Sequence, residues 1–144
     1  MKVSTKGRYG LRILLDVALH QEDGPVALSD VSSRQAISHK YLWQVINPLK
    51  SAGFLTATRG VKGGYVLARS PDKISIRDIV DILEGPISLA GPSKHVDQGV
   101  VRTTRETWLE IENKLNAIMS SITLADLIKR HKERESRIGP TYVI

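Results

Sequence analysis

The chain has 144 residues, a formal net charge of +6, 41% hydrophobic residues and no cysteine. This length fits one domain, or one domain with an appended dimerisation element. The lack of cysteine excludes disulfides and thiolate metal sites within these residues. No stretch approaches the roughly 18–20 apolar residues of a membrane span, and the first residues do not resemble a signal peptide. We therefore expect a cytoplasmic protein without membrane contact.

The positive charge is confined to the N-terminal half. Residues 1–71 hold ten basic and four acidic residues, whereas residues 72–144 hold eleven of each. From residue 31 to residue 71 there is no Asp or Glu, and there are six cations: Arg34, Lys40, Lys50, Arg59, Lys62 and Arg69. A folded segment that excludes carboxylates but keeps spaced cations is typical of a surface that binds a polyanion. The leading partner is therefore double-stranded DNA or another nucleic acid, and a solvated basic face is the alternative.

The first part of the chain predicts two helices. Ser4 or Thr5 can cap a first helix that runs to about His20, because apolar residues recur on one helical face at positions 11, 14, 15, 18 and 19. A short helix follows over about residues 28–35. The residues after it, Ala36 and Ile37, are expected to form a tight turn.

A third helix and a glycine-rich hairpin come next. Ser38 is a suitable N-cap for a helix over about residues 39–52. Two short segments of alternating polarity, 54–58 and 65–68, predict strands, and the loop between them carries glycines with a cation near each end. This order of elements is typical of a winged helix-turn-helix domain. The predicted fold is mainly α with a small β wing, over residues 1–85.

The second half of the chain predicts three further helices. The first, over about residues 76–84, begins with a Ser-x-x-Asp capping box. A loop at residues 86–102, rich in Gly, Pro and Ser, separates it from a long helix over about 103–121. We group the long helix and a shorter one after it as a dimerisation segment, residues 103–131. A charged C-terminal tail that ends in apolar residues follows at 132–144.

The long helix carries an apolar seam. Its members are spaced three and four residues apart, which is the period of a coiled coil: Trp108, Ile111, Leu115, Ile118 and Ile122. Over only about two heptads an ordinary core helix shows the same spacing. We favour dimerisation, because the winged domain already has a core and a two-fold dimer would present two reading helices to a palindromic operator.

The third helix is the candidate recognition helix, because the first residues of such a helix reach base edges in the major groove. Gln44 can pair with adenine, and Lys40 can contact guanine or a phosphate. Arg59 suits the minor groove beside a wing. Trp43 either packs within the domain or meets thymine methyl groups. The predicted DNA-binding residues are Ser38, His39, Lys40, Tyr41, Trp43, Gln44, Arg59, Gly60 and Lys62.

No catalytic arrangement is found in the sequence. The histidines, at positions 20, 39, 95 and 131, lack the spacing of a metal site, and the hairpin lacks the Lys-Ser/Thr pair of a nucleotide phosphate loop. We therefore expect no enzyme, no metal and no cofactor. A protein-interaction module whose basic face binds an acidic protein stays open as an alternative of another class.

Three segments together resemble one family of regulators. The opening segment 2–11, the stretch 37–44 and the hairpin 59–67 are similar to the BadM/Rrf-type transcriptional regulators, in register over nearly the whole chain. The resemblance implies a dimeric winged-helix transcription factor that acts mostly as a repressor. Trp43 departs from the Glu that is usual at this position in the family. The DNA contacts that the resemblance implies are Ser38, Lys40, Tyr41, Gln44 and Arg59.

The family includes iron–sulfur cluster regulators, nitric-oxide sensors and cysteine-metabolism repressors. Its cluster-binding members place Cys residues in the loop before the long helix, where residues 88–102 have none, so no thiolate-ligated cluster can form here. The chain is either a cluster-free member or a redox-sensing regulator whose Cys ligands are absent or replaced.

Two segments are similar to the cluster-free cysteine-metabolism repressors. They are residues 83–88 and the terminal Tyr142, Val143 and Ile144. This resemblance implies control of cysteine or sulfur metabolism. It also implies O-acetylserine sulfhydrylase as a partner enzyme, which would capture the C-terminal isoleucine and its carboxylate. The alternatives are a disordered terminus or a strand that packs on the neighbouring subunit.

Overall fold

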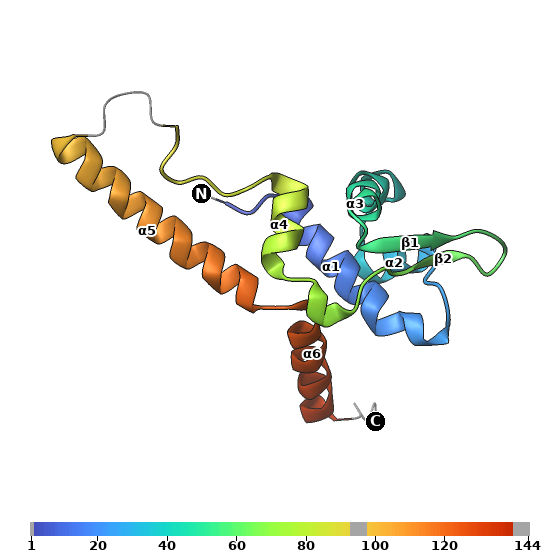
Figure 1. The fold of residues 1–144 in the computed structure, drawn as a ribbon. Coiled ribbons are helices and arrows are strands. Elements are labelled where there is room, and N and C mark those ends of the chain that lie inside the picture. The colour runs from blue at the N-terminus through green and yellow to red at the C-terminus, as the bar shows by residue number, and fades with distance from the viewer. Residues whose placement is uncertain (1, 93–97, 140–144) are drawn as a thin grey trace.

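The structure is a computed structural model that describes residues 2–92 and 98–139. Its N-terminal part is a helix-turn-helix followed by a two-stranded wing, and a long helix and a final helix complete the chain (Figure 1). This order confirms the predicted winged helix-turn-helix with a long additional helix. The elements are α1 (Thr5–His20), η1 (Gln21–Asp23), α2 (Leu28–Gln35), α3 (His39–Ser51), β1 (Leu55–Thr58), β2 (Gly64–Leu67), η2 (Pro71–Lys73), α4 (Ile76–Glu84), α5 (Gly99–Ser121) and α6 (Leu124–Ile138).

Side-chain caps fix where four of these helices begin. The hydroxyls of Ser4 and Ser38 accept backbone N–H groups at the starts of α1 and α3. Reciprocal capping boxes, headed by Ser75 and Thr123, begin α4 and α6. Each cap satisfies backbone donors that have no partner within the helix. The caps at Ser38 and Ser75 were predicted from the sequence, and Ser4 was one of the two candidates, with Thr5, for the cap of α1.

The core lies around α1, which contacts α2, α3, α4 and α6. The apolar face of α1 differs from the predicted one: Ile13 and Val17 are buried, whereas Leu11 is only partly buried. The reason is a close approach of α4 to Gly10, where a Cβ atom would lie 2.0 Å from Leu83 Cδ1. Because glycine carries no hydrophobic signal, the sequence pattern could not mark this side of the helix as buried.

The wing is an antiparallel hairpin held to the body by a backbone bridge. Thr58 lies opposite Gly64 in the register of β1 and β2. The N–H of Val26 donates to the carbonyl of Tyr65 at 2.9 Å, and the N–H of Tyr65 donates back at 2.8 Å. Gly64 has φ +157°, and a Cβ atom there would lie 2.3 Å from the Val26 carbonyl oxygen. The close approach that anchors the wing therefore requires glycine.

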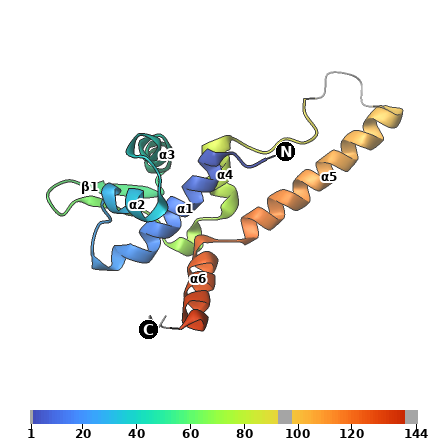
Figure 2. The same cartoon turned by 180° about the vertical axis from the view of Figure 1, so that it is seen from behind.

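Helix α5 extends from the body as a long arm in both views (Figures 1 and 2). None of its residues is buried. It begins at Gly99, four residues before the predicted start, and its C-terminal part contacts α4. Within the described part of the chain, no helix combines the length and the apolar character needed to cross a membrane.

Helix α6 runs to Ile138, whereas the sequence predicted an end near His131. Residues 132–137 are all polar, so they lack the apolar period that indicates a helix. They are rich in Lys, Glu and Arg, which are good helix formers. The first part of the predicted tail is therefore helical.

Candidate nucleic-acid interface

Helix α3 is held in the core by one side and exposes the other. Its buried residues are Leu42, Val45, Ile46 and Leu49. The exposed side carries four of the predicted DNA-binding residues: His39, Lys40, Trp43 and Gln44. Residues three and four apart share one side of a helix, so Lys40 lies beside both Trp43 and Gln44. The arrangement leaves this surface of α3 accessible to a partner.

Trp43 is 48% exposed. The structure therefore does not support the interpretation that Trp43 packs within the domain. The inner side of α3 is already filled by Leu42 and Val45, which are both fully buried. The indole lies where an apolar contact to a partner can form.

Tyr41 is partly buried at the start of α3, where its N–H donates to the Ser38 hydroxyl at 3.3 Å. Its ring meets that of Tyr9 edge-on, with centroids 5.4 Å apart and an interplanar angle of 89°. The guanidinium of Arg12 lies 4.8 Å from the centroid of the Tyr9 ring. Such edge-on and cation–π contacts favour one orientation of the rings. Tyr41 is thus tied to α1.

Two of the six cations in the acid-free segment have structural partners. Arg34 donates two hydrogen bonds of 2.9 Å to the carboxylate of Asp16. Arg69 lies 4.7 Å from the centroid of the Phe54 ring and donates to a backbone carbonyl. The charge pattern of the sequence therefore overstated the number of cations that are available to a partner.

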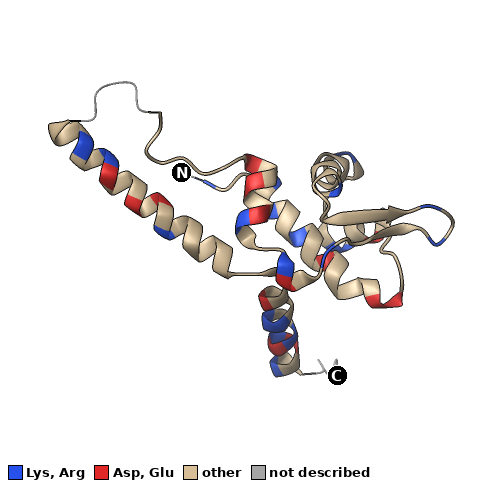
Figure 3. Ribbon diagram, in the orientation of Figure 1, with Lys and Arg blue, Asp and Glu red and all other residues tan. Residues whose placement is uncertain are grey.

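The other four cations are exposed and, among the residues that the structure describes, form no hydrogen bond or ion pair: Lys40, Lys50, Arg59 and Lys62. Figure 3 shows that α3 and the hairpin carry no carboxylate. Because no acid compensates these charges, this part of the surface is electropositive.

The hairpin loop presents its cations around an exposed tip. Gly60 has φ +118°, a backbone conformation that favours glycine, and its carbonyl accepts the N–H of Gly63 at 3.0 Å. Arg59 and Lys62 are exposed on either side of Val61, which is fully exposed. Strand β1 contacts α3, and both lie at the end of the molecule opposite the tip of α5 (Figures 1 and 2).

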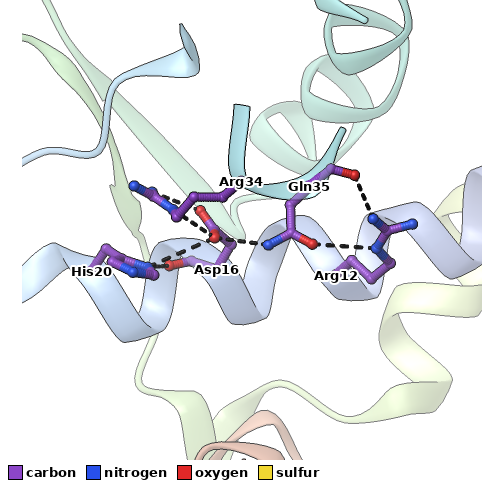
Figure 4. A network of polar contacts seen from close by, with 5 residues as sticks. All are labelled: Arg12, Asp16, His20, Arg34 and Gln35. Carbon is purple, nitrogen blue, oxygen red and sulfur yellow. Dashed lines mark hydrogen bonds and ion pairs between the residues drawn. The ribbon is translucent and has the colours of Figure 1, made fainter. Parts of the chain in front are cut away.

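Sequence reasoning missed the carboxylate of Asp16, which is 3% exposed. It lies on α1 and points toward Arg34 and Gln35 of α2 (Figure 4). Burial raises the pKa of Asp16, but hydrogen bonds from Arg34 and Gln35, with the charges of Arg34 and His20, lower it further, so the net pKa lies below its ordinary value. His20 Nδ1 lies 3.7 Å from Asp16 Oδ1. The position of Asp16 within an apolar stretch of α1 could have indicated a buried, paired carboxylate, because acids are seldom buried without a partner.

The predicted seam of α5 is exposed along most of its length. Trp108 is 51% and Ile118 58% exposed, and Ile111 is exposed as well. Leu115 and Ile122 are partly buried. Side chains of this size remain in water in the single chain.

An apolar groove lies beside the C-terminal part of α5, between it, the N-terminal segment and α4. It consists of two adjoining cavities of about 300 and 320 Å³. The first is almost wholly apolar, and its apolar lining residues are Val3, Leu11, Ile76, Ile79, Val80 and Met119. The groove and the seam together give the protein a second, largely apolar surface that a partner could cover.

The predicted partner-binding tail, Tyr142 to Ile144, lies outside the described residues, as does His95. Within residues 2–92 and 98–139, no group of three metal-ligating side chains is placed to hold a metal ion.

The model of the Rrf2 family, described as an iron-dependent transcriptional regulator, matches residues 3–130. The regulator CymR of Bacillus subtilis is 40% identical over 127 residues, which cover 88% of this chain and 89% of CymR. The solved structure of CymR, called the global cysteine regulator of B. subtilis, has a TM-score of 0.78 at 37% identity, covering 90% of this chain and 98% of that one. T. potens IscR has a TM-score of 0.76 at 37% identity, covering 93% of this chain and 90% of its own.

Proposed function

This chain belongs to the Rrf2 family of DNA-binding transcriptional regulators, and we propose that it is a cytoplasmic, homodimeric repressor of a palindromic operator. The observation that carries the proposal is the surface of α3 and the wing, where exposed cations lack acidic neighbours. A duplex carries one phosphate charge per about 1.7 Å of its axis and matches such a surface.

In this proposal α3 lies in the major groove and the wing in the adjoining minor groove. Trp43 and Gln44 face base edges: Gln44 recognises adenine, and Trp43 contacts thymine methyl groups. Lys40 contacts guanine or a phosphate beside it. Ser38, His39 and Tyr41 stand at the start of α3, where free backbone N–H groups favour a phosphate. Arg59 enters the minor groove, Gly60 lets the backbone approach, and Lys62 meets the flanking phosphates.

Dimerisation is proposed through the seam of α5. A helix without a single buried residue that exposes Trp108, Ile111 and Ile118 gains stability when a second copy covers these side chains. Closed two-fold symmetry is the commonest solution for such a contact. Two copies then place two α3 helices on half-sites one or more helical turns apart.

Selection from a random pool of duplexes tests this function. The wild-type protein should enrich a palindrome whose half-sites are about 10 base pairs or a multiple apart. Its affinity should fall steeply with salt, because each phosphate contact releases a counterion. Absence of any enriched sequence, with a flat salt response, would reject operator binding and favour the alternative of a basic face that binds an acidic protein.

For the regulated pathway, we propose cysteine or sulfur metabolism. The support is the similarity to CymR over most of both chains. The terminal residues Tyr142, Val143 and Ile144 are the segment proposed to enter O-acetylserine sulfhydrylase. Deletion of Ile144 should abolish co-purification with this enzyme, whereas Ile138→Ala, which removes an exposed apolar side chain from α6, should preserve it. Unchanged co-purification after the deletion would reject the partner.

An iron–sulfur or redox-sensing regulator is the second candidate, favoured by the similarity to IscR and by the description of the family as iron-dependent. The donor set of this chain does not fit such a cluster, because it includes no cysteine. Iron and sulfide analysis of the anaerobically purified protein should therefore find neither at a stoichiometric level. Stoichiometric amounts of both would establish this candidate instead.

A further inference from the structure

The carboxylate of Asp16 joins α1 to the last turn of α2. It accepts three side-chain hydrogen bonds of 2.9 Å, two from Arg34 and one from Gln35 Nε2 (Figure 4). The carboxylate is almost fully buried, whereas the side chain of Arg34 is 34% exposed. A buried carboxylate is stable only when it is paired and hydrogen-bonded. The end of α2 is therefore held at one place along α1.

A second link starts from the same end of α2 and reaches α3. Arg12 Nη2 donates to the backbone carbonyl of Gln35 at 2.5 Å, and Arg12 Nε donates to Gln35 Oε1 at 3.3 Å. The same guanidinium stacks on Tyr9, whose ring contacts Tyr41 in the first turn of α3. Hydrogen bonds and ring contacts thus connect Asp16 with the recognition helix. We call Arg12, Asp16, Arg34 and Gln35 the Asp16 network.

The turn between α2 and α3 is short and itself bonded. Gln35 is the last residue of α2, and Ser38 caps α3. Within the turn, Ile37 N–H donates to the carbonyl of Ser32 at 3.2 Å, and the Ser32 hydroxyl donates to the carbonyl of Ile37 at 2.6 Å. A shift at the end of α2 must therefore move the start of α3.

We infer that Asp16 is a positioning residue for DNA recognition, because its network sets where the first turn of α3 lies relative to α1. This inference rests on the proposed operator binding and concerns its selectivity. Base readout requires side chains to be held within about 0.5 Å of their productive geometry, whereas phosphate contacts tolerate small shifts. Loss of the network should consequently weaken binding to the operator more than binding to an unrelated duplex.

The test compares two duplexes, the sequence selected by the wild-type protein and a scrambled version of it. For Asp16→Asn, which keeps the shape but removes the charge, we expect an affinity for the selected duplex about tenfold lower, equal to the loss of one good base contact. Affinity for the scrambled duplex should change less than about twofold, because the phosphate-contacting cations remain. Each Kd is calculated with the concentration of active protein, which is measured by stoichiometric titration.

Ile74→Val is the control, because Ile74 is fully buried just before α4 and belongs to neither the Asp16 network nor the surface of α3 and the wing. It should lower the melting temperature while keeping the ratio of the two affinities. If Asp16→Asn does not fold, Arg12→Gln is measured instead, because it removes the link to Tyr9 and leaves the ion pair of Asp16 intact. In Arg12→Gln, the ratio of the affinity for the selected duplex to that for the scrambled duplex should fall at least about threefold.

An unchanged ratio in the folded Asp16→Asn protein, or in Arg12→Gln when the first variant fails to fold, would overturn the positioning role alone. A wild-type protein that prefers no selected duplex would instead overturn the operator binding on which this role rests. The two failures are thus distinguished by the behaviour of the wild-type protein.

Discussion

The surface of α3 and the wing differs from that of α5 in how its charges are balanced. The segment from residue 38 to residue 64 has four cations and no acid, whereas α5 has three basic and three acidic residues. On α5, Arg102 and Lys114 form ion pairs with acids one turn away, at 2.8 and 2.7 Å. Cations without acidic neighbours are typical of a surface that binds a polyanion, which supports the proposed DNA contact at α3 and the wing.

The two regions also differ in how well their apolar side chains are buried. Helix α3 has a fully buried inner stripe and exposes mainly polar residues, while α5 has no buried residue and exposes the large side chains of its seam. Apolar side chains in water gain free energy when a partner covers them. This contrast supports the proposal that nucleic acid covers one region and a second copy of the chain covers the other.

The largest expected effect comes from placing a charge in the seam of α5. Ile118→Glu should weaken dimerisation by about 3 kcal/mol or more, because the dimer would bury an unpaired carboxylate. Sedimentation equilibrium measures the change. Asn113→Glu, a matched charge on α5 outside the seam, should leave the dimer intact. An unchanged oligomeric state for Ile118→Glu would exclude this interface.

The next largest effect is expected from a substitution in the wing, measured as a loss of operator affinity. Arg59→Ala should weaken operator binding by about 1–3 kcal/mol if its guanidinium enters the groove. Lys129→Ala removes the same charge from α6 and should change the binding free energy by less than about 0.5 kcal/mol. Fluorescence anisotropy at fixed salt measures both. A loss of only a few tenths for Arg59→Ala would remove the wing from the mechanism.

The Asp16 network predicts a pH-dependent stability. Because the folded pKa of Asp16 is lowered, its contribution is present above the ordinary aspartate pKa of about 3.9 and is lost as pH falls through the folded value. At pH 7, Asp16→Asn should lower the free energy of unfolding by about 1.5 kcal/mol, a value kept modest because solvent screens the partly exposed Arg34.

Urea unfolding at several pH values measures this difference. The difference in unfolding free energy between the wild type and Asp16→Asn should shrink between pH 5 and pH 3, because acid neutralises the wild-type carboxylate. A difference that stays constant across this range would show that the charge of Asp16 adds nothing to stability.

The smallest effect concerns the turn that leads into α3. Ala36 adopts φ 53° and ψ 46°, a left-handed conformation that costs a non-glycine residue about 1–2 kcal/mol. Ala36→Gly should therefore raise the free energy of unfolding by about 0.5 kcal/mol after the entropy of glycine is subtracted. Ala125→Gly, inside α6, should lower it by up to about 1 kcal/mol. Destabilisation by Ala36→Gly would contradict the assigned turn geometry.

The sequence predicted the helix-turn-helix and the wing well because their signals are local. Ser38, Ser75 and Thr123 have capping chemistry that depends on a few neighbouring residues, and the hairpin is marked by its glycines. The ends of the last two helices were less predictable. Gly99 is a poor helix former, and residues 132–137 have no apolar side chain whose spacing could indicate a helix.

The pairing of charges could not be predicted from sequence, because it is set by residues far apart in the chain. Arg34 counts as a free cation in the sequence, yet its partner Asp16 lies 18 residues earlier on another helix. Arg69 likewise gains its partner Phe54 only through the fold of the hairpin. The exposure of Trp43 was left open for the same reason, since only packing decides which side of α3 is filled.

The claim that α3 and the wing form the DNA-binding surface is tested most directly by the salt dependence of operator affinity. The slope of the logarithm of the binding constant against the logarithm of the salt concentration is measured on one selected duplex. The proteins compared are the wild type, Lys40→Ala, Lys62→Ala and the double variant. The slope should decrease by about 0.9 for each phosphate contact removed, while Lys129→Ala keeps the wild-type slope. Identical slopes for the double variant and the wild type would place the DNA elsewhere on the molecule.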